Sequence, residues 1–154
     1  MTPVEAIPLE QTPAWLLWRV ANRWQALRRA VLAPMGLSNA QYLLLEGLDR
    51  IGGSDGAVTQ AALARFCQVD VTHASQVLRG LACQRLIARR RSADERVRTP
   101  ELTLAGRQLL ADARPAAAAV DAEFFRSLGP EANRFVMAMQ ALAGMKLRVP
   151  ASRG

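Results

Sequence analysis

Apolar residues recur every three or four positions along most of the chain, a spacing that predicts α-helices. The first such stretch begins at Thr12-Pro13, where threonine can cap a helix and proline fits its first turn. It ends near Pro34, so we expect a helix over about 13–33, preceded by a flexible arm at residues 1–12. Two of its tryptophans widen the apolar surface beyond one core-facing stripe, which suits a helix buried between subunits.

Three more helices are predicted before residue 86. The sequence LSNAQY at 37–42 contains a capping box, in which serine and glutamine bond each other's backbone amides, so a helix should run over about 39–51. GGSDGA then forms a loop, Thr59 caps a short third helix, and a fourth helix covers about 71–85. The residues expected to face inward are Ala62, Leu63 and Phe66 in the third helix and Ala74, Val77, Leu78 and Leu81 in the fourth.

Two short helices joined by a tight turn, the second with a polar outer face, are typical of a helix-turn-helix. The segment that follows has the pattern of a β-hairpin. Residues 86–91 form the first strand, SADE at 92–95 is the turn, and residues 96–102 return, with Pro100 restricting this strand to an edge position. The arginines that flank the turn would project beside the helix-turn-helix, as in a DNA-binding wing.

A long helix should follow the hairpin, starting at about residue 104 after the capping residue Thr103. Pro115 lies inside this span and should kink or divide the helix near Arg114. Gly129-Pro130 marks a break before a last helix at about 131–146, and residues 147–154 form a tail. The predicted fold class is therefore mainly α with a small β-hairpin.

Charge adds a functional indication to this pattern. The 154 residues carry 20 basic and 13 acidic side chains, a net charge of +7. Residues 59–98 hold eight arginines against three acidic residues, so +5 of the excess lies in the helix-turn-helix and the hairpin. A charge excess confined to one segment is typical of a surface that binds a polyanion such as DNA.

Four short motifs occur in the order expected for one known family of regulators. They are Leu37-Ser38-x-x-Gln41, Leu81…Leu86-Ile87, Arg91-x-x-Asp94-x-Arg96, and Leu102-Thr103-x-x-Gly106-x-x-Leu109. Together they resemble the MarR family of bacterial transcription regulators, over roughly residues 13–146. One departure is Arg85, where the family usually has glycine. If this position needs a left-handed backbone, arginine costs roughly 1 kcal/mol relative to glycine.

The resemblance implies a single winged helix-turn-helix domain at 13–146 that forms a homodimer. Dimerisation helices would lie at about 13–33 and 104–146, and the winged helix-turn-helix at about 38–103. The recognition helix would enter the major groove of a near-palindromic operator, and the wing an adjacent minor groove. Members of the family usually act as repressors, and many release DNA when a small aromatic or phenolic effector binds.

Candidate DNA-binding residues follow from these placements. Polar residues on the outer face of the recognition helix meet base edges or phosphates, and Gln76 suits adenine. Wing arginines enter or flank the minor groove, and Asp94 is expected to order the wing turn through an ion pair. The candidates are Thr72, His73, Ser75, Gln76, Arg79, Arg89, Arg91, Arg96 and Arg98. The alternative for each is an ordinary solvated surface.

The resemblance also implies an effector pocket, for which Trp18, Trp24 and Tyr42 are the candidates. The alternative is that these aromatic residues belong to the core and the dimer interface. Cys67 and Cys83 could act as redox switches, but small apolar packing is the default for a cysteine.

Other functional classes are less well supported. A nonspecific architectural DNA-coating protein would need the basic wing but little reading of bases. The sequence has no histidine–carboxylate–nucleophile set, no phosphate-binding glycine loop and no metal-ligand spacing, so we expect no enzyme, cofactor or metal. It has no apolar run long enough for a membrane span and no signal peptide, which favours a cytoplasmic protein without a membrane partner.

Overall fold

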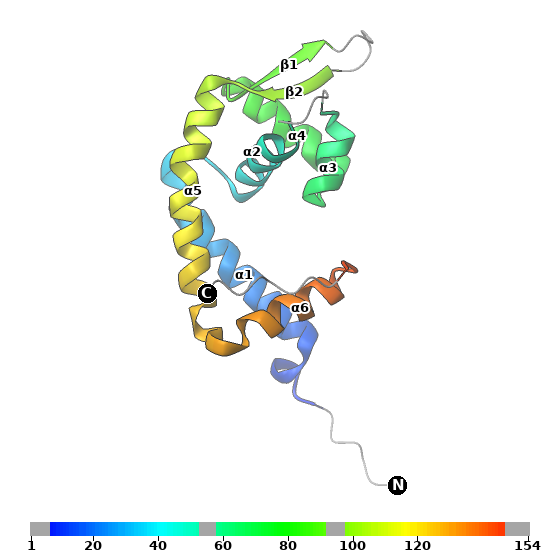
Figure 1. Cartoon of the computed structure of the whole chain (residues 1–154), viewed down its shortest axis with the longest axis vertical. Helices are drawn as coiled ribbons and strands as arrows, with labels where there is room; N and C mark the ends of the chain where they lie inside the picture. The colour runs from blue at the N-terminus through cyan, green and yellow to red at the C-terminus, as the bar shows by residue number, and fades with distance from the viewer. Residues whose placement is uncertain (1–6, 53–57, 92–97, 147–154) are drawn as a thin grey trace. The chain divides into compact units, whose positions relative to one another are not determined.

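The computed structural model describes residues 7–52, 58–91 and 98–146 (Figure 1). The chain divides into two compact units, Met1–Ala117 and Ala118–Gly154. The first unit holds a short 3-10 helix η1 (Leu9–Gln11), helix α1 (Pro13–Leu32), η2 (Ala33–Met35), α2 (Asn39–Gly52), α3 (Gln60–Cys67), α4 (Val71–Cys83), and strands β1 (Ile87–Arg91) and β2 (Arg98–Leu102). Helix α5 (Leu104–Phe125) starts in the first unit, and η3 (Arg126–Glu131) and α6 (Ala132–Leu142) complete the second.

The predicted helix starts are confirmed by their capping hydrogen bonds. The Ser38 backbone amide donates to the Gln41 side chain at 2.9 Å, and the Gln41 amide donates to the Ser38 hydroxyl at 3.1 Å. The Thr59 hydroxyl accepts from the Ala62 amide at 3.1 Å. Each bond satisfies an amide that the first helical turn leaves without a backbone partner, so local sequence fixes where these helices begin.

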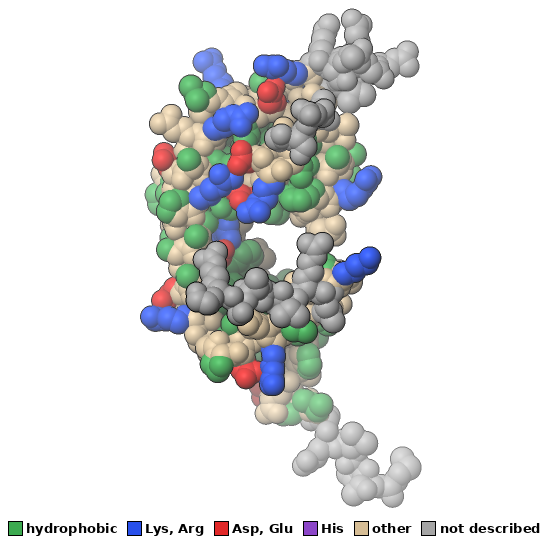
Figure 2. Space-filling view, viewed as in Figure 1, with side chains coloured by type: hydrophobic (Ala, Val, Ile, Leu, Met, Phe, Trp, Pro, Cys, Tyr) green, Lys and Arg blue, Asp and Glu red, His purple; other side chains and the backbone are tan. Residues whose placement is uncertain are grey.

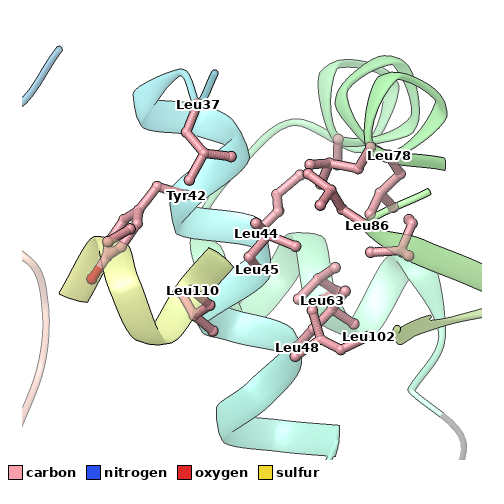
Figure 3. Close-up of a cluster of buried hydrophobic side chains, with 14 of the residues drawn as sticks. Leu37, Tyr42, Leu44, Leu45, Leu48, Leu63, Leu78, Leu86, Leu102 and Leu110 are labelled. Carbon is pink, nitrogen blue, oxygen red and sulfur yellow. The ribbon is translucent and has the colours of Figure 1, made fainter. Parts of the chain in front are cut away.

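Buried leucines from α2, α3, α4 and the hairpin form the core of the first unit (Figure 3). In Figure 1 these helices lie beneath the β1–β2 hairpin, and α5 begins beside it. The largest side chains that are fully buried are Leu32, Leu44, Leu45, Leu63, Leu78, Leu81 and Leu110.

The expectation that Phe66 faces inward is wrong, because its side chain is 51% exposed. Helix α3 instead turns Leu63 and Cys67 toward α2, where Gly47 allows a close approach. A Cβ added at Gly47 would lie 2.5 Å from the Cys67 sulfur and 2.9 Å from a Leu63 methyl group. The small thiol fits this contact, and the larger phenyl ring lies at its edge.

The junction between hairpin and long helix explains the Leu-Thr-x-x-Gly motif. The Thr103 hydroxyl donates to the Arg85 carbonyl at 2.8 Å, and its oxygen accepts from the Gly106 amide at 3.0 Å. A Cβ at Gly106 would lie 2.0 Å from the Leu86 carbonyl oxygen, so only glycine fits. The motif therefore holds the start of α5 against the end of the recognition helix.

Pro115 does not divide the long helix, because α5 continues from Leu104 to Phe125. The proline removes one backbone hydrogen bond. Ala113 and Ala117 on either side of it are buried, and this packing supports the helix across the gap in its bonding.

The second unit confirms the predicted break at Gly129, whose φ of 49° is left-handed. Helix α6 starts one residue after the expected position but ends at Leu142, four residues before the expected end at 146. Gly144, with φ of 67°, ends it, because a left-handed residue cannot continue a helix. The Phe125 ring contacts those of Phe124 and Phe135, with centroids 5.1 and 5.9 Å apart.

Candidate nucleic-acid interface

The recognition helix α4 presents one polar and one apolar face, as expected. Ala74, Leu78 and Leu81 are buried against the core. Ser75 is half-buried, and the exposed side chains that face outward are Thr72, His73, Gln76 and Arg79. Thr72, Gln76 and Arg79 follow each other at helical spacing, which places them along one line about 10 Å long. Such a line has the length and chemistry to follow base edges in a major groove.

Asp70 fixes the beginning of this helix, a role that the sequence analysis did not assign. Its carboxylate accepts from the Thr72 amide at 2.9 Å and from the His73 amide at 3.1 Å. The preceding turn contains Gln68 in a left-handed conformation, with φ of 54°. The carboxylate thereby stabilises the helix terminus from which Thr72 and His73 project.

The wing separates its arginines between two faces. Ile87 pairs with Leu102 at the base of the hairpin, and both are buried. Because strand residues alternate, Arg89 shares the face of Ile87, and Arg90 lies on the other face. The Arg90 guanidinium is ion-paired with the Glu101 carboxylate, 2.7 Å from nitrogen to oxygen. Arg89 is exposed, so the two neighbouring arginines have different electrostatic surroundings.

Of the other predicted wing residues, the structure places only the backbones of Arg91 and Arg98. Arg91 and Arg98 are partners in the strand register. Their side chains, together with Asp94 and Arg96, lie outside the described residues, so their proposed roles stay predictions. Figure 2 shows arginine side chains at the hairpin end of the first unit, with acidic side chains among them.

A charged cluster on α2 and α5 was missed by the sequence analysis. The Arg114 guanidinium donates to the Glu46 carboxylate at 2.9 Å and also to the Asp49 carboxylate. A guanidinium nitrogen of Arg107 lies 3.8 Å from a carboxylate oxygen of Asp49, and one of Arg50 lies 3.0 Å from a carboxylate oxygen of Glu46. The hydrogen bonds to Asp49 and Glu46 raise the pKa of Arg114. The available signal was two acids three positions apart on one helix and two arginines seven apart on another.

The predicted pocket residues are only partly brought together. The Arg28 guanidinium lies 5.0 Å from the Trp24 ring centroid and 4.8 Å from that of Tyr42, so one cation links both rings. Burial, followed by the charge of Glu46, raises the pKa of Tyr42, and the guanidinium of Arg28 opposes this rise. Trp18 is 71% exposed on α1.

The two cysteines differ in their surroundings. The Cys67 thiol donates to the Leu43 carbonyl at 3.5 Å, and burial raises its pKa. A raised pKa disfavours the thiolate that redox chemistry requires. Cys83 is exposed at the end of α4. Within residues 7–52, 58–91 and 98–146, no group of three potential metal ligands occurs, and no helix has the length and apolarity to cross a membrane.

Comparisons with known proteins agree with this geometry. A sequence model of the MarR family matches residues 35–96. The uncharacterised HTH-type transcriptional regulator YdcH of Bacillus subtilis (strain 168) is 30% identical over 132 residues, which cover 85% of this chain and 89% of the relative.

Two solved structures from Mycobacterium tuberculosis are also similar. The transcriptional regulator MOSR in complex with DNA is 26% identical, with a TM-score of 0.70 over 87% of this chain and 97% of that chain. A MarR family protein in complex with salicylic acid is 27% identical, with a TM-score of 0.66 over 90% of this chain and 98% of that chain.

A helix-turn-helix followed by a two-stranded wing defines the winged-helix class of DNA-binding regulators. The family model that matches residues 35–96 names the family within that class, and the relationship to YdcH extends over 85% of the chain. The chain belongs to the MarR family and is a transcriptional regulator. The expected fold class and the expected family are both confirmed.

Proposed function

We propose that the protein is a sequence-specific repressor that binds a near-palindromic operator as a homodimer. The exposed polar line on α4 beside an arginine-rich wing is the observation that carries this proposal. Gln76 would read a base edge, and Arg79, Arg89 and the wing-tip arginines would contact the DNA backbone or the minor groove. The relative crystallised with DNA supports the same class of partner.

Exposed apolar side chains support the dimer. On α1 they are Leu16, Leu17, Trp18, Val20 and Leu27. In the second unit they include Val136, Met139 and Leu142. Large apolar residues gathered on a helix that faces solvent are typical of a surface that another chain covers. Two copies joined through these helices would present two recognition helices to the two halves of a palindrome.

A small aromatic or phenolic effector is the proposed signal for release. The relative crystallised with salicylic acid supports this class of ligand. In this chain, Arg28 between Trp24 and Tyr42 offers a cation and two aromatic rings, which suit an aromatic molecule with a negative charge. A cytoplasmic location follows from the proposed action on chromosomal DNA.

Footprinting of the purified protein on the DNA that flanks its own gene tests the proposal. A protected near-palindrome is the expected result, with weaker protection after salicylate is added. Equal affinity for this DNA and for random duplexes would instead indicate a nonspecific architectural protein. Redox sensing would give a different result: peroxide would abolish the protection and a reductant would restore it. A Cys83→Ser variant would then keep its protection in peroxide.

A further inference from the structure

We propose that Arg114 is a positioning residue for DNA recognition, which fixes α5 against α2 and thereby sets the half-site spacing that the dimer accepts. The inference rests on the proposed function, since it requires two recognition helices on one operator. It assigns a role in DNA binding to a residue that is remote from the recognition helix in the sequence.

The contacts of Arg114 make it a bridge between two helices. Its guanidinium bonds two carboxylates of α2 at once, Glu46 at 2.9 Å and Asp49. A planar guanidinium that holds two acids fixes direction as well as distance, unlike a single flexible ion pair. The pairs that Arg50 and Arg107 make with the same acids add charge balance, but each of these contacts involves one carboxylate.

Arg114 lies near the end of the part of α5 that packs on the first unit. The buried contacts of α5 in the first unit end at Ala117, and the boundary between the two compact units follows directly. Pro115 removes a backbone hydrogen bond at the same point, which weakens the helix there. Ala113 and Ala117 pack by contact alone, so Arg114 supplies the directional restraint at the end of this packed segment.

The restraint reaches the recognition helix through α2. Helix α4 packs against α2, and both contribute to the same leucine core. In a dimer held through its terminal helices, the separation of the two α4 helices therefore depends on the angle between α2 and α5. Since successive base pairs lie about 3.4 Å apart, small changes in this angle alter which half-site spacing fits.

A set of duplexes with altered spacing tests the proposal. Wild-type protein first selects its preferred palindrome from a random library, and one or two base pairs are then inserted or removed at the centre. We expect wild type to discriminate between spacings. Arg114→Gln should reduce this discrimination by about tenfold. Its affinity for random duplexes should stay close to that of the control variant Arg50→Gln.

Arg50→Gln is the matched control. It removes the same charge and an ion pair to the same acid, Glu46, but Arg50 lies on α2 itself and bridges no helices. Wild-type discrimination in Arg50→Gln, together with reduced discrimination in Arg114→Gln, would support the proposal. Equal discrimination in all three proteins would overturn it.

A purely structural role predicts a different result. In that case Arg114→Gln would lower the melting temperature and weaken binding to every spacing equally. Should Arg114→Gln fail to fold, Arg114→Lys keeps the charge and loses the planar double contact, and the same reduction is expected. If the wild-type protein selects no palindrome, the proposed function itself fails. If the wild-type protein and both variants discriminate equally between spacings, only the role of Arg114 fails.

Discussion

Arginine is used differently in the α2–α5 region and in the region of α4 and the wing. Between α2 and α5, Arg50, Arg107 and Arg114 are matched by the carboxylates of Glu46 and Asp49. In the α4–wing region, the described residues give Arg90 an acidic partner in Glu101, and Arg79 and Arg89 are exposed. Net charge alone does not distinguish a framework from a binding surface; the partners of each arginine do. Mutations in the α2–α5 region should therefore change stability or the half-site spacing that the protein accepts, and mutations in the α4–wing region should change direct contacts with DNA.

The largest expected effect lies in the framework, at Gly106. Gly106→Ala places a Cβ on the Leu86 carbonyl and forces backbone movement, which should lower the free energy of unfolding by about 3 kcal/mol. Gly80→Ala is the control, because its Cβ would meet its nearest neighbour at 3.8 Å and alanine favours a helix interior. That variant should gain roughly 0.5–1 kcal/mol. Urea unfolding measures both, and a Gly106→Ala protein as stable as wild type would contradict the assigned junction.

The next largest effect is expected on the DNA surface, at Gln76. Gln76→Ala should cost about 1–3 kcal/mol at one base position and leave nonspecific binding nearly unchanged. Titration of single-base operator variants identifies the position. Equal losses on operator and random DNA would show that Gln76 does not read a base. The exposed position of Gln76 leads us to expect an unchanged melting temperature, in contrast to Gly106→Ala.

Substitution of wing arginines should have a smaller effect on DNA affinity, and this effect should depend on the salt concentration. Arg96→Ala should flatten the dependence of log affinity on log salt by about one unit, because one counterion fewer is released. Arg90→Ala should change the slope less, since Glu101 already balances Arg90. Filter binding across a salt series compares the two. A larger change for Arg90 than for Arg96 would contradict the proposed DNA contact by Arg96.

Local signals in the sequence predicted most of the fold. The capping box at Ser38 and Gln41, and the cap at Thr59, are contacts within four residues, so sequence alone places them. Tertiary packing decided the rest. Phe66 is as apolar as Leu63, but the packing of α3 on α2 buries Leu63 in the core and leaves Phe66 51% exposed. Pro115 stays within a continuous helix because of the burial around it, which no local rule describes.

The α4 face of the candidate interface could be predicted because it depends on local helical spacing. The charged cluster of α2 and α5 could not, because it depends on tertiary packing. Residues of α4 share one helix, so helical spacing alone placed Thr72, His73, Gln76 and Arg79 on its outer face. The contact between Arg114 and Glu46 spans 68 positions in sequence and depends on how α2 packs against α5. A single sequence, read by itself, indicates such a pair only through the opposite charges of its members.

The smallest expected effect is at Arg85, between the two regions. Its φ of 59° is left-handed, as the family's usual glycine at this position predicts. Arg85→Gly should raise the free energy of unfolding by about 1 kcal/mol, because glycine adopts this conformation without strain. The backbone bonds would remain, since the Arg85 carbonyl accepts from Thr103 and its amide donates to Ala82.

Gln68→Gly is the comparison for this prediction, since Gln68 has a similar φ of 54°. Its gain should be smaller, because the Gln68 side chain donates to the Arg65 carbonyl at 2.8 Å and that bond would be lost. Arg85 has no ion pair among the residues that the structure describes, so its removal sacrifices no such contact there. Differential scanning calorimetry of both variants orders the two gains. Destabilisation by Arg85→Gly would mean that the arginine side chain contributes more to the junction than its strained backbone costs.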